Sequence, residues 1–365
     1  MSDGTPDDGA RPTVDGLRGT LRVVVATPLS EDLCTRIERA EPRIELVRDQ
    51  DVLPPGRWPA DFSGDPAFRR TARQQARFEE LLDTADALYG IPDVDPAALA
   101  RTVRANPGLV WVQTMAAGGG AQVRAAGLTP EELDRVRFTT SAGVHGDPLA
   151  EFAVLGVLAG AKRLPRLQRD QRAGDWPGRW AMAQVADQTV LVVGVGGIGR
   201  RVAAKLAALG AHVIGTSRRG ERPEGVHEVV HPDEIRTVMP RVDALVNTLP
   251  GTDATTGLLS GSVFSAAPEG LTVVNVGRGT VIDEPGLVAA LESGRVGFAA
   301  LDVFAVEPLP ADSPLWRRDD VLVSPHTAAL SAGEERRIAD LFVDNARRLL
   351  DGRPQRNVVD TVEFY

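Results

Sequence analysis

The chain has 365 residues, enough for two domains that each bury a core. A net charge of −9 argues against the basic surface of a nucleic-acid-binding protein. The single cysteine, Cys34, excludes an intrachain disulfide and agrees with a reducing cytoplasm. No apolar run approaches the ~18 residues that span a bilayer. We therefore expect a cytoplasmic protein with neither a membrane nor a nucleic-acid partner.

The first half of the chain alternates between strand and helix patterns. Residues 1–18 are polar and acidic and predict a disordered tail. Strands are expected at 21–27, 43–47, 86–90 and 109–113, with helices near 33–40, over 68–85 and from Pro96. This alternation is typical of a parallel sheet. The Pro- and Gly-rich loop at 51–66 has no assigned role.

The second half repeats this alternation after a long helix expected at 147–164. Its strands are expected at 189–194, 212–216, 243–249, 271–276, 297–304 and 321–325. A last amphipathic helix, at 333–352, ends at Gly352, which is a helix-stop residue. The sequence therefore predicts an α/β protein with two doubly wound parallel-sheet domains.

A glycine-rich loop opens the second half. Gly194, Gly196 and Gly199 form G-x-G-x-x-G between a strand and an amphipathic helix that starts near Gly197. The first glycine permits a tight turn, the second lets the backbone approach a pyrophosphate, and the third lets the helix pack on the strand. The context indicates a dinucleotide site; the alternative is an ordinary structural turn.

Three later stretches each place a chemically active side chain just after a strand. They are "VVNVGRGTVID" with Arg278, "ALDVFAVEPLP" with Glu307 and "LVSPHTAAL" with His326. Ligands bind at the carboxyl ends of strands in open α/β sheets, so these three side chains are candidates for one site. Taken singly, each is equally typical of a surface residue.

These motifs, in this order with "WVQTMAAGG" and "NTLPGTDATTGLL", resemble the D-isomer-specific 2-hydroxyacid dehydrogenases. The resemblance implies a Rossmann cofactor domain inserted into a flavodoxin-like substrate domain. The expected boundaries are 1–18 for the tail, 19–144 for the first part of the substrate domain, 145–327 for the cofactor domain and 328–365 for the rest of the substrate domain, which contains the returning C-terminal helix.

The resemblance also implies residue roles. Arg278 would hold the carboxylate and keto oxygen of the substrate, because a guanidinium fork binds two oxygens at once. His326 would be the acid/base, oriented by Glu307. Ala117 and Gly118 would present backbone N–H groups to the substrate carboxylate. The implied cofactor contacts are Gly194, Gly196, Gly197, Ile198, Gly199, Thr248, Leu249, Pro250, Thr255, Val276 and Asp302, of which Asp302 would lie near the nicotinamide carboxamide. No metal site is expected.

The end of the strand at 212–216 raises the question of cofactor type. An NAD-binding protein usually has Asp or Glu there, to accept the ribose 2′-hydroxyl. This chain has Ser217, Arg218 and Arg219 instead, which suit the 2′-phosphate of NADP. We therefore expect NADP(H) to be preferred and NAD(H) to be possible. The alternative is a solvated turn. Arg makes up all of the Lys and Arg residues except Lys162 and Lys205, so two adjacent arginines are weak evidence for a binding site in this chain.

Together these features predict an NADP(H)-preferring oxidoreductase that reduces small 2-keto acids to D-2-hydroxy acids, as glyoxylate and hydroxypyruvate reductases do. By resemblance we expect a homodimer. Two alternatives remain open: a cofactor-sensing interaction protein on the same fold, similar to the corepressors, and a different Rossmann oxidoreductase. The substrate side-chain pocket is expected near Ile91, Gly119 and Trp316, but the sequence does not identify the keto acid.

Overall fold

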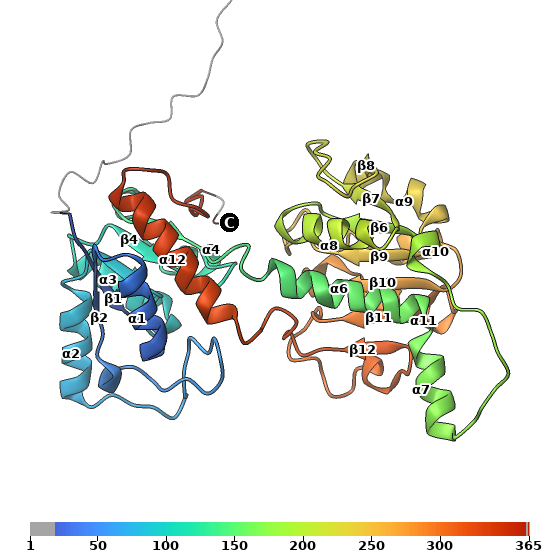
Figure 1. Ribbon diagram of the computed structural model, residues 1–365, viewed down its shortest axis with the longest axis horizontal. Coiled ribbons are helices and arrows are strands. Elements are labelled where there is room, and N and C mark those ends of the chain that lie inside the picture. The colour runs from blue at the N-terminus through green and yellow to red at the C-terminus, as the bar shows by residue number, and fades with distance from the viewer. Residues whose placement is uncertain (1–18, 363, 365) are drawn as a thin grey trace, which may run out of the picture. The chain divides into compact units, whose positions relative to one another are not determined.

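A computed structural model describes residues 19–362 and 364, and its chain divides into two compact units (Figure 1). Unit 1 comprises the described residues of Met1–Val144 and Ser331–Tyr365, and unit 2 comprises His145–Leu330. The tail predicted at 1–18 lies outside the described residues. Within the described part of the chain, no helix combines the length and apolar character needed to cross a membrane.

Unit 1 is built on a five-stranded parallel sheet. Its strands are β1 (Leu21–Val25), β2 (Ile44–Val47), β3 (Ala87–Tyr89), β4 (Trp111–Gln113) and β5 (Arg137–Thr139). Their order is β2-β1-β3-β4-β5, with every pairing parallel. This is the flavodoxin-like order, and it confirms the fold predicted for this part of the chain.

Helices cover the sheet of unit 1. They are α1 (Glu31–Ala40), α2 (Ala72–Leu82), α3 (Pro96–Ala105), α4 (Gly120–Ala125), α5 (Pro130–Arg135) and α12 (Glu334–Leu350). α12, red in Figure 1, comes from the far end of the sequence and packs against α1 and the sheet. Its Phe342 is fully buried, stacked on Trp111 at 4.7 Å between ring centroids and edge-on to Tyr89 at 5.1 Å.

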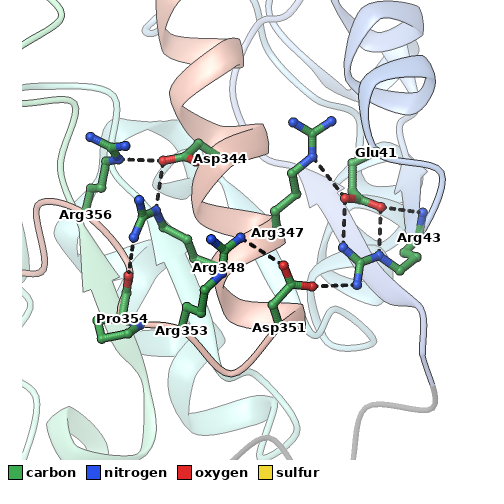
Figure 2. A network of polar contacts seen from close by, with 9 residues as sticks. All are labelled: Glu41, Arg43, Asp344, Arg347, Arg348, Asp351, Arg353, Pro354 and Arg356. Carbon is green, nitrogen blue, oxygen red and sulfur yellow. Dashed lines mark hydrogen bonds and ion pairs between the residues drawn. The ribbon is translucent and has the colours of Figure 1, made fainter.

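An ion-pair network ties the C-terminal end of α12 to the start of β2 (Figure 2). The Glu41 carboxylate is buried and accepts hydrogen bonds from Arg43 Nε at 2.9 Å and Arg347 Nε at 3.1 Å. The Arg43 guanidinium also reaches Asp351 at 2.9 Å. These charge-assisted bonds join segments about 300 positions apart in the sequence.

Unit 2 is built on a seven-stranded parallel sheet. Its strands are β6 (Thr189–Val193), β7 (His212–Thr216), β8 (Glu228–Val230), β9 (Ala244–Asn247), β10 (Leu271–Asn275), β11 (Val296–Leu301) and β12 (Val321–Val323). The strand order is β12-β11-β10-β9-β6-β7-β8. From β6, the chain adds β7 and β8 on one side and then β9 to β12 on the other, as in a Rossmann fold. The predicted doubly wound cofactor fold is thus confirmed.

Helices lie on both faces of this sheet. One face packs on α6 (Gly146–Ala161) and α8 (Gly197–Ala208), and the other on α9 (Ile235–Val238), α10 (Gly261–Ser265) and α11 (Glu284–Glu292). Figure 1 shows α6 lying along β10 and β11. Two apolar cores, one on each face, fix the carboxyl ends of the strands that carry the candidate site residues.

Several elements differ from the sequence prediction. β5 and β8 were not predicted, because "RFT" and "EVV" each begin with a charged residue and contain only one or two apolar side chains. The helix expected at 147–164 ends at Ala161, where Arg163 turns into the left-handed region with φ 51°, and α7 (Leu164–Ala173) begins separately. The loop at 51–66 is held by Asp61, which accepts bonds from Arg57 and the Gly64 N–H.

Candidate active site

The glycine-rich loop joins β6 to α8. Gly194 has φ 91°, a conformation in which a side chain would be strained, and a Cβ there would also meet the Leu249 side chain. A Cβ on Gly199 would lie 1.8 Å from the Gly194 carbonyl oxygen, so α8 packs directly on the loop backbone. The Gly194 N–H donates to the Thr216 hydroxyl at 2.8 Å, a contact that sequence reasoning missed. The loop therefore has one fixed shape.

The loop leaves open space where phosphates would lie. A Cβ on Gly196 or Gly197 would meet no atom within 4 Å. The N–H groups of the first turn of α8 have no partner within the helix and point out of its N-terminus, together with the positive end of the helix dipole. The residues present thus fit the pyrophosphate of a dinucleotide.

The segment after β7 forms a compact turn with two free cations. Ser217 Oγ accepts the N–H groups of Arg219 at 3.3 Å and Glu221 at 3.2 Å, and the Ser217 N–H donates to Val230 O at 3.1 Å. The Arg218 and Arg219 side chains are exposed and make no hydrogen bond or ion pair with any residue that the structure describes. The turn therefore presents two unneutralised guanidinium groups at the end of β7.

Arg278 is held between two crowded glycines after β10. A Cβ on Gly277 would lie 2.5 Å from Leu249 O, and one on Gly279 would lie 1.8 Å from the Phe304 carbonyl carbon. The Arg278 carbonyl accepts from Asn275 Nδ2 at 3.2 Å, and its exposed side chain donates to Gly277 O at 2.8 Å. The backbone around Arg278 is thus fixed while its guanidinium keeps donors for a ligand.

Glu307 and His326 form a hydrogen-bonded pair. His326 Nδ1 lies 2.7 Å from Glu307 Oε2, and Glu307 Oε1 accepts the Phe304 N–H at 2.9 Å. Burial raises the pKa of the Glu307 carboxyl, but the bonds from His326 and Phe304 and the nearby charge of Arg278 outweigh it and hold that pKa below its usual value. The ionised carboxylate orients the ring and leaves its Nε2 for a substrate.

Asp302, which is 1 % exposed, fixes the segment that carries His326. Its Oδ1 accepts from Ser324 Oγ at 2.6 Å, from the Thr327 N–H at 2.9 Å and from the Ala328 N–H at 3.0 Å. Its own carbonyl accepts the His326 N–H at 2.9 Å. Sequence reasoning associated Asp302 with the nicotinamide and missed this bracing contact, for which Ser324 in "SPHTA" is the only sequence signal.

The remaining predicted cofactor residues form the segment after β9 and the end of β10. Thr248 Oγ1 donates to Gly194 O at 2.6 Å, and Thr255 Oγ1 donates to Pro250 O at 2.7 Å. Both hydroxyls thus shape the loops. The Val276 side chain lies in the core, which leaves only its backbone for a ligand.

Ala117 and Gly118 lie in unit 1, in the turn between β4 and α4. Both residues are exposed, and neither backbone N–H donates to a residue in the described part of the chain. The turn is fixed by Thr114, because a Cβ on Gly119 would lie 1.8 Å from the Thr114 hydroxyl oxygen. It therefore offers two free N–H donors in a fixed turn.

Comparison with known proteins gives matches over both units. Residues 154–328 match the family model described as the D-isomer specific 2-hydroxyacid dehydrogenase, NAD binding domain. A glyoxylate/hydroxypyruvate reductase A from Salmonella dublin is 32 % identical over 256 residues, which are 70 % of this chain and 81 % of the relative.

Solved structures match as well. A D-isomer specific 2-hydroxyacid dehydrogenase from Xanthobacter autotrophicus Py2, in complex with NADPH and MES, is 30 % identical with a TM-score of 0.73, covering 95 % of this chain and 100 % of that one. An NADPH-dependent glyoxylate/hydroxypyruvate reductase from Sinorhizobium meliloti, in complex with NADP and sulfate, is 26 % identical with a TM-score of 0.72 and the same coverage.

Proposed function

This chain belongs to the D-isomer-specific 2-hydroxyacid dehydrogenase family, and we propose that it is an NADPH-preferring reductase of small 2-keto acids. The observation that carries the proposal is the Glu307–His326 pair, 2.7 Å apart, on the same strand edge as Arg278 and the glycine loop. The Salmonella relative and the Sinorhizobium structure, both glyoxylate/hydroxypyruvate reductases by name, support this substrate class.

Arg278 supplies the cationic group that a 2-keto acid requires. The guanidinium can bind a carboxylate oxygen and the keto oxygen together. In unit 1, the N–H groups of Ala117 and Gly118 are donors of the kind that a carboxylate oxygen accepts. Arg278 would thus hold the carboxylate and the keto oxygen of a small keto acid.

His326 would act as the acid in reduction. When bound, the reduced nicotinamide supplies the hydride that adds to C2 of the keto acid. The Nε2–H of protonated His326 gives its proton to the oxygen on C2, which becomes the hydroxyl. Glu307 stabilises the protonated ring before this step, and Arg278 stabilises the negative charge that develops on the oxygen.

Arg218 and Arg219 would select NADP(H). Their guanidinium groups have no partner among the residues that the structure describes, so a 2′-phosphate would not have to displace an ion pair within that part of the chain. Two exposed charge-assisted contacts of about 1–1.5 kcal/mol each predict a roughly 10²-fold preference for NADPH over NADH. The Xanthobacter and Sinorhizobium structures, which hold NADPH and NADP, support this reading.

A panel of 2-keto acids, assayed with NADPH and with NADH, tests the proposal. We expect turnover of at least one small keto acid, with kcat/KM roughly 10²-fold higher for NADPH. The variant Arg218→Ala/Arg219→Ala should lose most of that preference while keeping activity with NADH. Absence of turnover with every keto acid would favour a cofactor-sensing protein, and equal use of both cofactors would make the arginine turn a solvated surface.

A further inference from the structure

The segment that carries Glu307 is braced on both sides of that residue. Before it, Phe304 is buried in the core of unit 2, and the Ala305 N–H donates to Glu284 Oε2 at 3.2 Å. After it, the Pro310 carbonyl accepts the indole N–H of Trp316 at 2.9 Å. Glu307 itself lies on an exposed stretch between these two anchors.

Glu284 connects this segment to the one that carries Arg278. It is the first residue of α11, whose Leu287 and Leu291 are buried and fix the helix to the sheet. The chain runs from Arg278 through a short 3-10 helix (Gly279–Val281) into α11, so Arg278 and Glu284 share one rigid stretch of backbone. The Gly279 backbone also packs directly against the Phe304 carbonyl, which leaves no space for a Cβ. This is a second contact between the same two segments.

We propose that Glu284 is a positioning residue, which sets the place of Glu307 against His326 by accepting the Ala305 N–H. The inference depends on the proposed function, because it assigns Glu284 to the same site. Without this acceptor, the stretch from Ala305 to Glu307 keeps only the Gly279 contact on the Arg278 side. The carboxylate of Glu307 would then spend less time at the 2.7 Å distance from His326 Nδ1.

Two variants of Glu284 distinguish the effect of the accepted hydrogen bond from the effect of the negative charge, and thermal unfolding reports any change in stability. Glu284→Ala removes the acceptor, whereas Glu284→Gln keeps a side-chain oxygen and removes the charge. Glu292→Ala, at the exposed far end of α11, is the matched control. For each protein, kcat, KM for the keto acid, KM for NADPH and the pH dependence of kcat would be measured, with thermal unfolding as a separate readout.

We expect Glu284→Ala to lower kcat about tenfold, with KM for NADPH unchanged. Its rate of keto-acid reduction should fall off at a lower pH than in the wild type, because the protonated His326 ring is less well stabilised. Glu284→Gln should restore both readouts, and Glu292→Ala should match the wild type.

Two results would overturn the inference. One is a wild-type pH profile and kcat in Glu284→Ala; the other is a Glu284→Gln variant as impaired as Glu284→Ala, since the effect would then not pass through the accepted N–H. A wild-type protein that reduces no 2-keto acid would instead refute the proposed function, so the two failures are distinguishable.

Discussion

His326 has φ 53°, a left-handed backbone conformation that costs a non-glycine residue of the order of 1 kcal/mol or more. The Asp302 carboxylate holds this conformation by accepting hydrogen bonds from Ser324, which precedes His326, and from Thr327 and Ala328, which follow it. This backbone conformation directs the ring to Glu307. The hydrogen bonds to Asp302 therefore offset the cost of the conformation that fixes one side chain.

The Glu307–His326 pair gives a prediction about pH. Glu307→Gln removes the negative charge beside the ring, so the protonated form of His326 is less favoured. We expect the pH range for keto-acid reduction to shift to lower pH, while His326→Ala slows reduction by roughly 10²–10⁴-fold at all pH values. The measurement is kcat/KM against pH with NADPH; NADPH binding, followed by fluorescence, should be retained in both variants.

An unshifted pH profile in Glu307→Gln would show that the pair has no part in the proton transfer. His231→Asn serves as the control, because His231 is an exposed histidine of unit 2 whose contacts are to Asp233 and Glu234. Its pH profile should equal that of the wild type.

Residue roles differ in how far the sequence reveals them. The positions of Arg278, Glu307 and His326 after neighbouring strands could be predicted, because each is embedded in a local motif that follows a strand; their catalytic roles stay predictions. The partners Thr216 and Glu284 could not, because their contacts, to Gly194 and Ala305, span 22 and 21 positions and exist only once the sheet has formed. The substrate side-chain pocket has no local pattern either.

At the scale of elements, α12 is stabilised by charge as well as by its apolar face. Glu41 accepts hydrogen bonds from Arg43 and Arg347, and these outweigh the effect of its burial and lower the pKa of its carboxyl to about 2. A carboxyl whose pKa is lowered on folding stabilises the fold above the pKa of the unfolded chain, and this contribution disappears as pH falls through the folded value.

Glu41→Gln should therefore destabilise unit 1 in a pH-dependent way. Near neutral pH we expect a loss of about 1–3 kcal/mol in the free energy of unfolding, because a buried charge-assisted network loses its shared acceptor. The difference from the wild type should shrink as pH falls from about 4.5 towards 2. Hydrogen exchange of the amides of β1 to β4, measured across this pH range, checks the prediction.

A loss of stability that is the same at pH 3 and at pH 7 would contradict the role of the charge. Glu45→Gln is the control, because Glu45 pairs with Arg22 on the exposed side of β2 and such surface pairs contribute about 0–1 kcal/mol. Its effect should be small at every pH.

Elements with clear periodicity could be predicted, whereas boundaries set by single residues could not. The alternating and apolar runs gave β1, β6, β10 and α12 within a few residues. The break between α6 and α7 depends on the φ of Arg163, and the start of α2 depends on a capping box between Thr71 and Gln74. These are local hydrogen-bond and backbone features that hydrophobic periodicity does not register.

At the scale of the molecule, unit 2 carries several apolar side chains that are exposed in the part of the chain that the structure describes. In α7 and the segment 174–184 no side chain is buried. Trp176 is 95 % exposed, and Leu155 on α6 and Met182 are 50 % and 41 % exposed. Solvent-exposed apolar groups in one stretch are typical of a protein interface. In the homodimer expected from the resemblance, a second copy of this chain would cover these side chains.

Light scattering should then give twice the mass of one chain at micromolar concentration. The double variant Leu155→Ser/Trp176→Ser should raise the dimer dissociation constant by at least tenfold, because burying these two side chains contributes a few kcal/mol. Trp58→Ser, which removes a half-exposed tryptophan of unit 1, should leave the mass unchanged. A wild-type protein that is monomeric at all concentrations would contradict this expectation.

The division of the chain also sets an order of events during synthesis. Unit 2 is complete once Leu330 has been made, but unit 1 still lacks α12 at that moment. Until α12 has been synthesised, Trp111 and Tyr89 lack the Phe342 ring that packs on them, and the Glu41 carboxylate lacks the hydrogen bond from Arg347. The order of the chain therefore allows unit 2 to fold before unit 1 is complete, and until α12 has been made the sheet of unit 1 lacks the helix that covers part of its apolar face.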